Sequence, residues 1–140
     1  MVNGYYRFHN GIYPRQLYVA VGADEEYVNN TFFSDKGCFT LDWDGADAAT
    51  FDEVKERSTQ VYGSLVVFRS KNEMTPKVMA HEAIHVLDSF MNTLGLERAV
   101  DGTNEHLSYL VGWIVDCMDD VRVGKAEIVK TDKIKRKDKK

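Results

Sequence analysis

The sequence predicts an α+β fold, with a small mixed β-sheet followed by two site-forming helices. Short segments rich in Val, Leu, Tyr and Phe occupy the first half of the chain. Two longer segments with apolar residues at helical spacing follow, between residues 75 and 121. The 140-residue length corresponds to one domain, which we place at residues 1–129. Strand segments first and helices last indicate α+β rather than an alternating α/β fold.

The expected elements of the first half differ in how clearly they are marked. Residues 60–70 are rich in β-branched and aromatic side chains and predict a strand. Residues 15–22 predict a second strand that ends at a glycine. Residues 37–43 alternate apolar and polar side chains, as a half-buried strand does. We expect residues 24–33 to form a short helix or an irregular segment, and residues 44–59 to form a helix.

The first long helix carries start and stop signals. Thr75 is a suitable N-cap, Pro76 suits the first helical position, and Gly95 suits the position after the end. Its predicted apolar face comprises Met79, Ala83, Ile84, Leu87, Phe90, Met91 and Leu94. A second helix is predicted over residues 103–121. Its apolar face comprises Leu107, Leu110, Val111, Ile114 and Met118.

The first helix contains the spacing H-E-x-x-H at His81, Glu82 and His85. Residues four apart on a helix project in the same direction, so the two histidines can reach one ion. Glu82 is rotated by about 100° and can stand beside the ion without binding it. Metalloproteases use this spacing to hold Zn²⁺ and to take a proton from its bound water. The H-E-x-x-H spacing therefore predicts a zinc site on this helix, and Asp88 falls on the same face as the histidines. Two solvated histidines on a surface helix are the other interpretation.

A catalytic zinc ion requires a third protein ligand. Glu105, twenty residues after His85, is the first candidate, because it lies opposite the apolar stripe of its own helix. The small residues Ser108 and Gly112 share its face, as does Asp116, and would let the two helices approach closely. His106 points about 100° away from Glu105 and is an alternative ligand. A closed structural site would need a fourth ligand, for which Asp88 and His106 are the nearby candidates.

The two motifs together resemble the zincin superfamily, specifically the gluzincin arrangement of thermolysin-like peptidases. His81-Glu82-Ala83-Ile84-His85 is followed by Asn104-Glu105-His106-Leu107-Ser108, in the manner of that family's second helix. The resemblance covers about residues 75–121. It implies a metallopeptidase with His81, His85 and Glu105 as zinc ligands and Glu82 as general base. Tyr109 replaces the family's final aspartate, so Asp88 or Asp116 would have to hydrogen-bond a ligand histidine instead.

The pattern also resembles small H-E-x-x-H proteins of phages and mobile elements, which match this chain better in size. In a minimal zincin-like core, an edge strand runs beside the site helix and can bind an extended peptide. We expect residues 63–70 to be that strand. Oxyanion stabilisation would come from Tyr109, His106 or Tyr62. The alternative is a catalytically silent binding or accessory protein on a zincin frame.

Composition narrows the partners and the location. Residues 130–140 carry a charge of +5 and one apolar side chain, so we expect a disordered basic tail. The rest of the chain carries about −9, which makes nucleic acid an unlikely partner beyond weak contacts of the tail. No apolar run suits a membrane span, and the N-terminal residues lack a signal-peptide pattern. We expect Cys38 and Cys117 to be buried free thiols in the cytoplasm.

Overall fold

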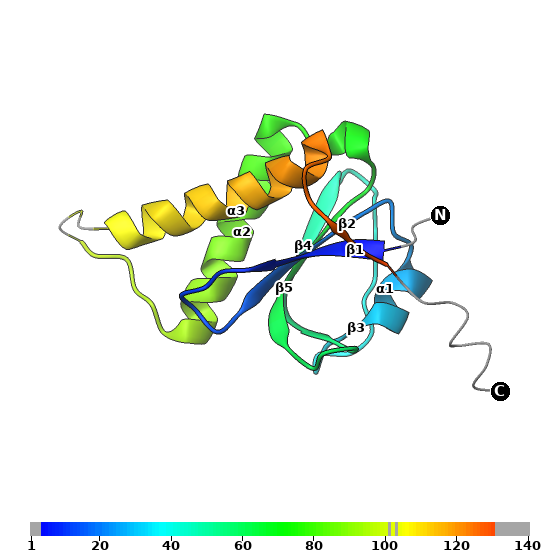
Figure 1. Cartoon of the computed structure of the whole chain (residues 1–140), viewed down its shortest axis with the longest axis horizontal. Coiled ribbons are helices and arrows are strands. Elements are labelled where there is room, and N and C mark those ends of the chain that lie inside the picture. Colours follow the sequence, from blue (N-terminus) through cyan, green and yellow to red (C-terminus); the bar gives the residue numbers. More distant parts are fainter. Residues whose placement is uncertain (1–3, 101, 103, 131–140) are drawn as a thin grey trace.

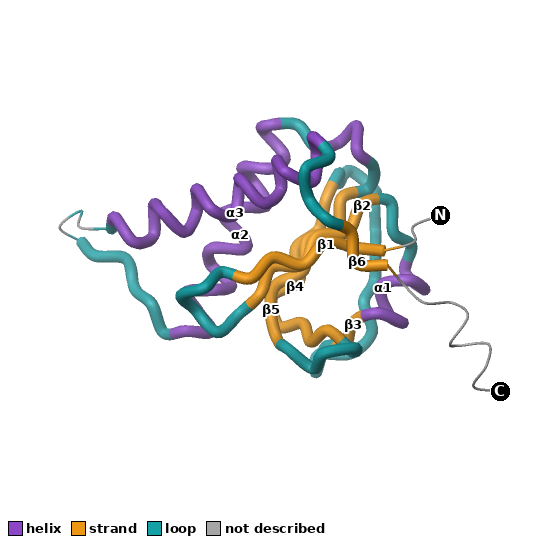
Figure 2. Tube along the Cα trace, in the orientation of Figure 1, coloured by secondary structure: helices purple, strands orange, loops and turns teal. Residues whose placement is uncertain are grey.

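The computed structural model describes residues 4–100, 102 and 104–130. They form a curled six-stranded sheet with helices on both faces (Figure 1, Figure 2). The elements in chain order are β1 (Gly4–His9), β2 (Gln16–Val21), α1 (Glu25–Thr31), β3 (Phe32–Phe33), β4 (Ala48–Glu56), β5 (Tyr62–Phe68), a 3-10 turn (Lys71–Glu73), α2 (Pro76–Leu94), α3 (Glu105–Val123) and β6 (Ile128–Lys130). This arrangement confirms the predicted α+β class.

The strands lie in the order β3-β4-β5-β2-β1-β6. Only β2 and β5 are parallel, and all other neighbours in the sheet are antiparallel. The sheet is therefore mixed, as predicted. The long connection from β2 to β5 passes through α1, β3 and β4 and makes this parallel pairing possible.

The two faces of the sheet bury separate apolar clusters. Helices α2 and α3 pack side by side on one face, where Leu17, Val19, Val66 and Phe68 point toward them. Helix α1 and the loop before β4 cover the opposite face (Figure 1). Strands β2 and β5 contribute to both clusters, because successive side chains alternate between the faces of a strand. No helix in the described ranges has the length and apolarity to cross a membrane.

Helix α2 begins and ends where the sequence predicts. The Thr75 side chain accepts a hydrogen bond from the Val78 amide, which caps the first turn. Gly95 adopts a left-handed conformation with φ of 70°, and its amide donates to the Met91 carbonyl. The predicted apolar face is wrong at Ile84, which is 48% exposed. Val86 is buried in its place, because the buried face of α2 is turned toward β4.

Two elements of the first half are predicted wrongly. Residues 44–59 contain strand β4 instead of a helix, and residues 37–43 contain no strand. In residues 37–43, the side chain of Asn29 makes backbone hydrogen bonds that a partner strand would otherwise make. It accepts from the Phe39 amide at 2.8 Å and donates to the Phe39 carbonyl at 3.0 Å. The Glu25 carboxylate likewise accepts from the Leu41 amide.

Three further expectations need correction. Strand β5 is central and lies between β4 and β2, so residues 63–70 are not an edge strand. Cys38 is exposed, whereas Cys117 is buried as predicted. Lys130, the first residue of the predicted tail, is the last residue of β6. Residues 131–140 lie outside the described residues.

Candidate metal centre on helix α2

His81 and His85 stand next to each other on the exposed side of α2. Their Nε2 atoms are 3.2 Å apart, and their ring centroids are 4.9 Å apart. Two imidazoles at the usual zinc–nitrogen distance of about 2.0–2.1 Å, with a tetrahedral angle between them, have their nitrogens about 3.3 Å apart. The pair therefore has the spacing that two ligands of one tetrahedral zinc ion require.

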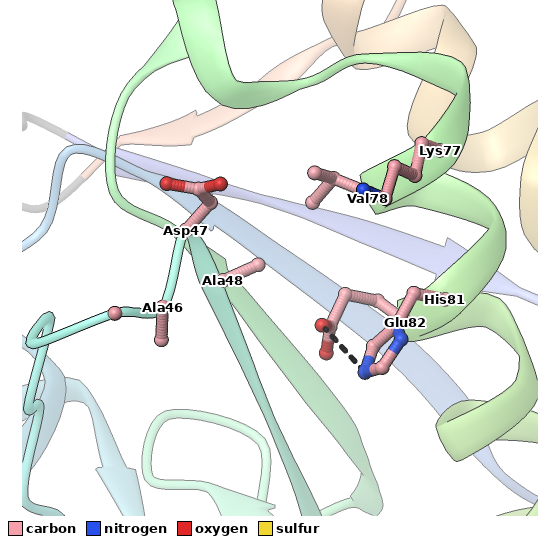
Figure 3. Close-up of a pocket in the computed structure, with 8 residues that line it drawn as sticks. Ala46, Asp47, Ala48, Lys77, Val78, His81 and Glu82 are labelled. Atoms are coloured by element: carbon pink, nitrogen blue, oxygen red, sulfur yellow. Dashed lines mark ion pairs between the residues drawn. The ribbon is translucent and has the colours of Figure 1, made fainter.

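Glu82 lies on the neighbouring flank of the helix and is only 6% exposed. Its Oε1 accepts a hydrogen bond of 2.6 Å from the Thr50 hydroxyl of β4. Its Oε2 lies 3.9 Å from His81 Nε2 (Figure 3, dashed line). One carboxylate oxygen is thus anchored to the sheet, while the other faces the histidine.

A pocket of about 290 Å³ opens beside Glu82. It lies between the start of β4 and the first turns of α2, and Figure 3 shows the Glu82 and His81 side chains at one end of it. Its walls are Gly45, Ala46, Asp47, Ala48, Lys77, Val78, His81 and Glu82. Small side chains on the strand side leave the space, so a substrate group can approach the Glu82 carboxylate from there.

Strand β4 presents an open edge next to this pocket. Within the described chain, β3 pairs with β4 only at Lys55 and Glu56, so β5 is the single strand partner of residues 48–54. The loop after β3 contacts this stretch through side chains, at Phe51 and Asp52. The Asp47 carbonyl accepts from the Arg69 amide and so points toward β5. Backbone direction alternates along an antiparallel strand, so the backbone groups of Ala48 and Thr50 face the open edge.

The structure does not bring Glu105 to the histidines. Around the axis of α2, the contacts of Glu82 and Ser89 with β4 lie about 80–100° from His81. Phe90, whose ring faces Trp113 of α3, lies about 180° from His81, so α3 packs on the far side of the helix. Across residues 4–100, 102 and 104–130, no three His, Cys, Asp or Glu side chains form a group that could hold a metal ion.

The face of α3 that carries Glu105 points to solvent. Glu105, Ser108, Gly112 and Asp116 are all exposed, and a side chain added at Gly112 would meet no atom within 4 Å. The expectation that these small residues let the helices approach closely is therefore wrong. Helix α3 contacts the core through its opposite face, which buries Leu107, Leu110, Ile114, Cys117, Met118 and Val121.

The remaining predicted site residues lie apart from the pocket. His106 and the 74% exposed Tyr109 line a second hollow of about 320 Å³, between the β1–β2 turn and α3. Tyr62 opposes Lys55, at the other end of β4 from Ala48. Asp88 is exposed on α2, one turn beyond His85.

Sequence reasoning missed Thr50, which is the nearest hydrogen-bond partner of Glu82. The sequence predicts a helix over residues 44–59, and a helix there would not place Thr50 in a strand that faces α2. Correct assignment of β4 would have provided the signal, since the Thr50 side chain lies on the same sheet face as that of Ala48.

No family model, no curated protein and no solved structure matches this chain.

Proposed function

We propose that this protein is a zinc-dependent metallopeptidase of the zincin type. One observation carries the proposal: a pair of histidine nitrogens 3.2 Å apart stands beside a buried carboxylate that borders a pocket. The spacing and chemistry of His81 and His85 fit two ligands of Zn²⁺. The assignment to the zincin type comes from the sequence resemblance. The position of the H-E-x-x-H motif on helix α2 is consistent with that type.

The residues of this chain would divide the reaction among them. When bound, Zn²⁺ supplies Lewis acidity that activates water and polarises a peptide carbonyl. His81 and His85 hold the ion. Glu82 accepts the proton that the attacking water loses and returns it to the leaving amine. Its position at the wall of the pocket gives it access to both groups.

The third ligand remains a prediction. Glu105 is our first candidate. For Glu105 to reach the histidines, the start of α3 has to move toward the side of α2 that carries His81 and His85. The ten-residue connection that precedes Glu105 has no regular secondary structure where it is described. His106 and Asp88 are the other candidates. Asp88 shares the helix face of the histidines and needs no movement of α3.

An extended peptide or protein segment is the proposed substrate. Strand β4 replaces residues 63–70 as the strand that would receive it, because β4 has an open edge beside the pocket. The amide and carbonyl of Thr50 would pair with the peptide backbone. Glu82 contacts the side chain of Thr50, so the scissile bond of a peptide paired with Thr50 would lie close to the Glu82 carboxylate.

A Glu82→Gln variant tests this proposal. We expect zinc binding to remain and hydrolysis of a peptide library to fall by about 10²- to 10⁴-fold, as for loss of a general base. Glu97→Gln, at an exposed position in the loop after α2, is the matched control and should keep full activity. Full hydrolysis by a zinc-loaded Glu82→Gln variant would exclude the general-base role.

A catalytically silent binding or accessory protein, of phage or mobile-element type, is the second candidate. It is favoured because no three His, Cys, Asp or Glu side chains of the described residues are gathered in one group that could hold a metal ion. It predicts zinc binding through His81 and His85 without hydrolysis of any peptide. A basic tail acting as a tether belongs to this candidate. Deletion after Val129 with no change in any partner interaction would argue against the tether.

Location and further partners remain part of the proposal. Cys38 and Cys117 are free thiols, which suits the reducing cytoplasm. We propose no membrane partner, and no nucleic-acid partner beyond weak contacts of the basic tail.

A further inference from the structure

Glu82 accepts a short hydrogen bond from the hydroxyl of Thr50, and the two residues come from different layers of the fold. Thr50 belongs to strand β4, and Glu82 belongs to helix α2, 32 positions later in the chain. The donor–acceptor distance is 2.6 Å, within the range of hydrogen bonds to a charged oxygen. Because Glu82 is only 6% exposed, little water is available to replace this hydroxyl.

This bond selects one orientation of the carboxylate. Oε1 is occupied by Thr50, so Oε2 is the oxygen that lies toward His81. A free glutamate side chain has three rotatable bonds and would sample other orientations. Fixing the carboxylate at the wall of the pocket holds Oε2 where it can accept a proton from a reacting water.

Thr50 also belongs to the open edge of β4. Its backbone groups face that edge, while its side chain faces α2. A peptide added to β4 would therefore contact the backbone of the residue that holds the general base. A shift of this strand on substrate binding would move the Thr50 hydroxyl and the Glu82 carboxylate together.

We propose that Thr50 is a positioning residue, which orients the Glu82 carboxylate and connects it to the peptide-binding edge of β4. This inference rests on the proposed peptidase function. It predicts that the Thr50 hydroxyl affects turnover and leaves zinc binding unchanged, because this hydroxyl bonds to Glu82 whereas His81 and His85 contact each other.

The first test compares Thr50→Val with Thr50→Ser on a peptide substrate. Val keeps the β-branched shape and removes the hydroxyl, whereas Ser keeps the hydroxyl. We expect kcat to fall about 10- to 100-fold in the Val variant, with KM within about twofold of wild type and with normal zinc content. The Ser variant should recover most of the lost kcat, which a purely structural role of Thr50 would not predict.

Thr93→Val is the matched control. Thr93 donates to Glu53 at 3.0 Å and thus forms a second Thr–Glu bond between α2 and β4, eleven residues beyond Glu82. Loss of this bond should leave kcat unchanged. An equal loss of kcat in the Thr93→Val and Thr50→Val variants would overturn the positioning role, since it would indicate a general loosening of this interface.

A second readout needs no activity. In metal-free protein, Thr50→Val and Glu82→Met should each lower Tm. The Tm loss of the double variant should be clearly smaller than the sum of the two single losses, because both substitutions remove the same hydrogen bond. By contrast, the Tm loss of a Thr93→Val and Glu82→Met double variant should equal the sum of the two single losses.

The outcomes separate the two ideas. Wild-type turnover by the Thr50→Val variant of an active enzyme overturns the inference and leaves the peptidase proposal intact. An inactive wild type overturns both, and the Tm experiment then shows whether the bond exists as a structural contact alone.

Discussion

Replacement of Arg7 by Met should destabilise the protein far more than the same change at an exposed arginine. The Glu56 carboxylate is fully buried and accepts from Arg7 Nε at 3.0 Å and from the Arg7 terminal nitrogen at 2.6 Å. Thr59 donates at 2.5 Å, and Tyr5 also donates. Arg7→Met removes the only cation that contacts Glu56 within the described chain and leaves a buried charge.

The size of the effect follows from this burial. Removing one partner of a buried ion pair costs about 3–5 kcal/mol, and we expect about 3 kcal/mol because the Arg7 side chain is 31% exposed. For a protein of this length that corresponds to a Tm loss of about 10 °C. The Arg122–Asp119 pair is close to half exposed on both sides, so Arg122→Met should cost less than about 1 kcal/mol.

The penalty should also depend on pH. Burial raises the pKa of Glu56, but the hydrogen bonds from Arg7, Thr59 and Tyr5 outweigh it and hold the pKa below its ordinary value of 4.5. A carboxylate with a lowered folded pKa stabilises the protein above its unfolded pKa, and this contribution is lost as the pH falls through the folded value. The difference between wild type and Arg7→Met should therefore shrink below about pH 4.

Thermal and urea unfolding, followed by circular dichroism at pH 7 and at pH 3.5, measure these differences. Equal Tm losses in Arg7→Met and Arg122→Met at pH 7 would refute the reasoning. So would a penalty that grows on acidification, because it would mean that Arg7 does not stabilise the ionised form of Glu56.

Two further predictions concern packing and thiol chemistry. Gly63→Ala should lower the free energy of unfolding in urea by more than about 3 kcal/mol, because a Cβ there would overlap the carbonyl of Gln16 on β2. Gly112 faces open space on α3, so Gly112→Ala should raise the free energy of unfolding by about 0.5–1 kcal/mol. Burial and neighbouring carboxylates raise the pKa of Cys117 to about 12, so a disulfide reagent should titrate one thiol, Cys38, in the native protein and two after unfolding. Rapid native reaction of both thiols would contradict this burial.

Helix α2 could be predicted from the sequence because its signals are local. Thr75 caps the first turn with its own side chain, Pro76 starts the helix, and Gly95 ends it in a left-handed conformation. The H-E-x-x-H spacing then places His81 and His85 together without help from any other element. These features depend on residues within a few positions of each other.

Strand β4 could not be predicted because a bulge disguises its alternation. The register with β5 shifts between Phe51 and Val54. The extra residue brings both of these side chains to the same face of the sheet, although they are three positions apart. A spacing of three is typical of a helix and not of a strand, so this stretch does not show the alternation by which a strand is recognised.

The surroundings of Glu82 depend on that same strand and therefore also escaped prediction. Its burial and its bond to Thr50 arise from contacts between segments 32 positions apart. The placement of Glu105 likewise depends on which face of α3 packs on the core. The apolar spacing correctly predicts that Leu107, Leu110, Ile114 and Met118 are buried. It does not show that the opposite face of α3, which carries Glu105, points away from α2.

Metal content tests the central claim most directly. Wild-type protein without a tag should be compared with His81→Ala and Glu105→Ala after equilibration with zinc and gel filtration. We predict about one zinc ion per wild-type chain, with binding lost in His81→Ala and sharply weakened in Glu105→Ala. Zinc retained in Glu105→Ala would move the third ligand to His106 or Asp88. A folded wild-type protein that binds no zinc would contradict the account.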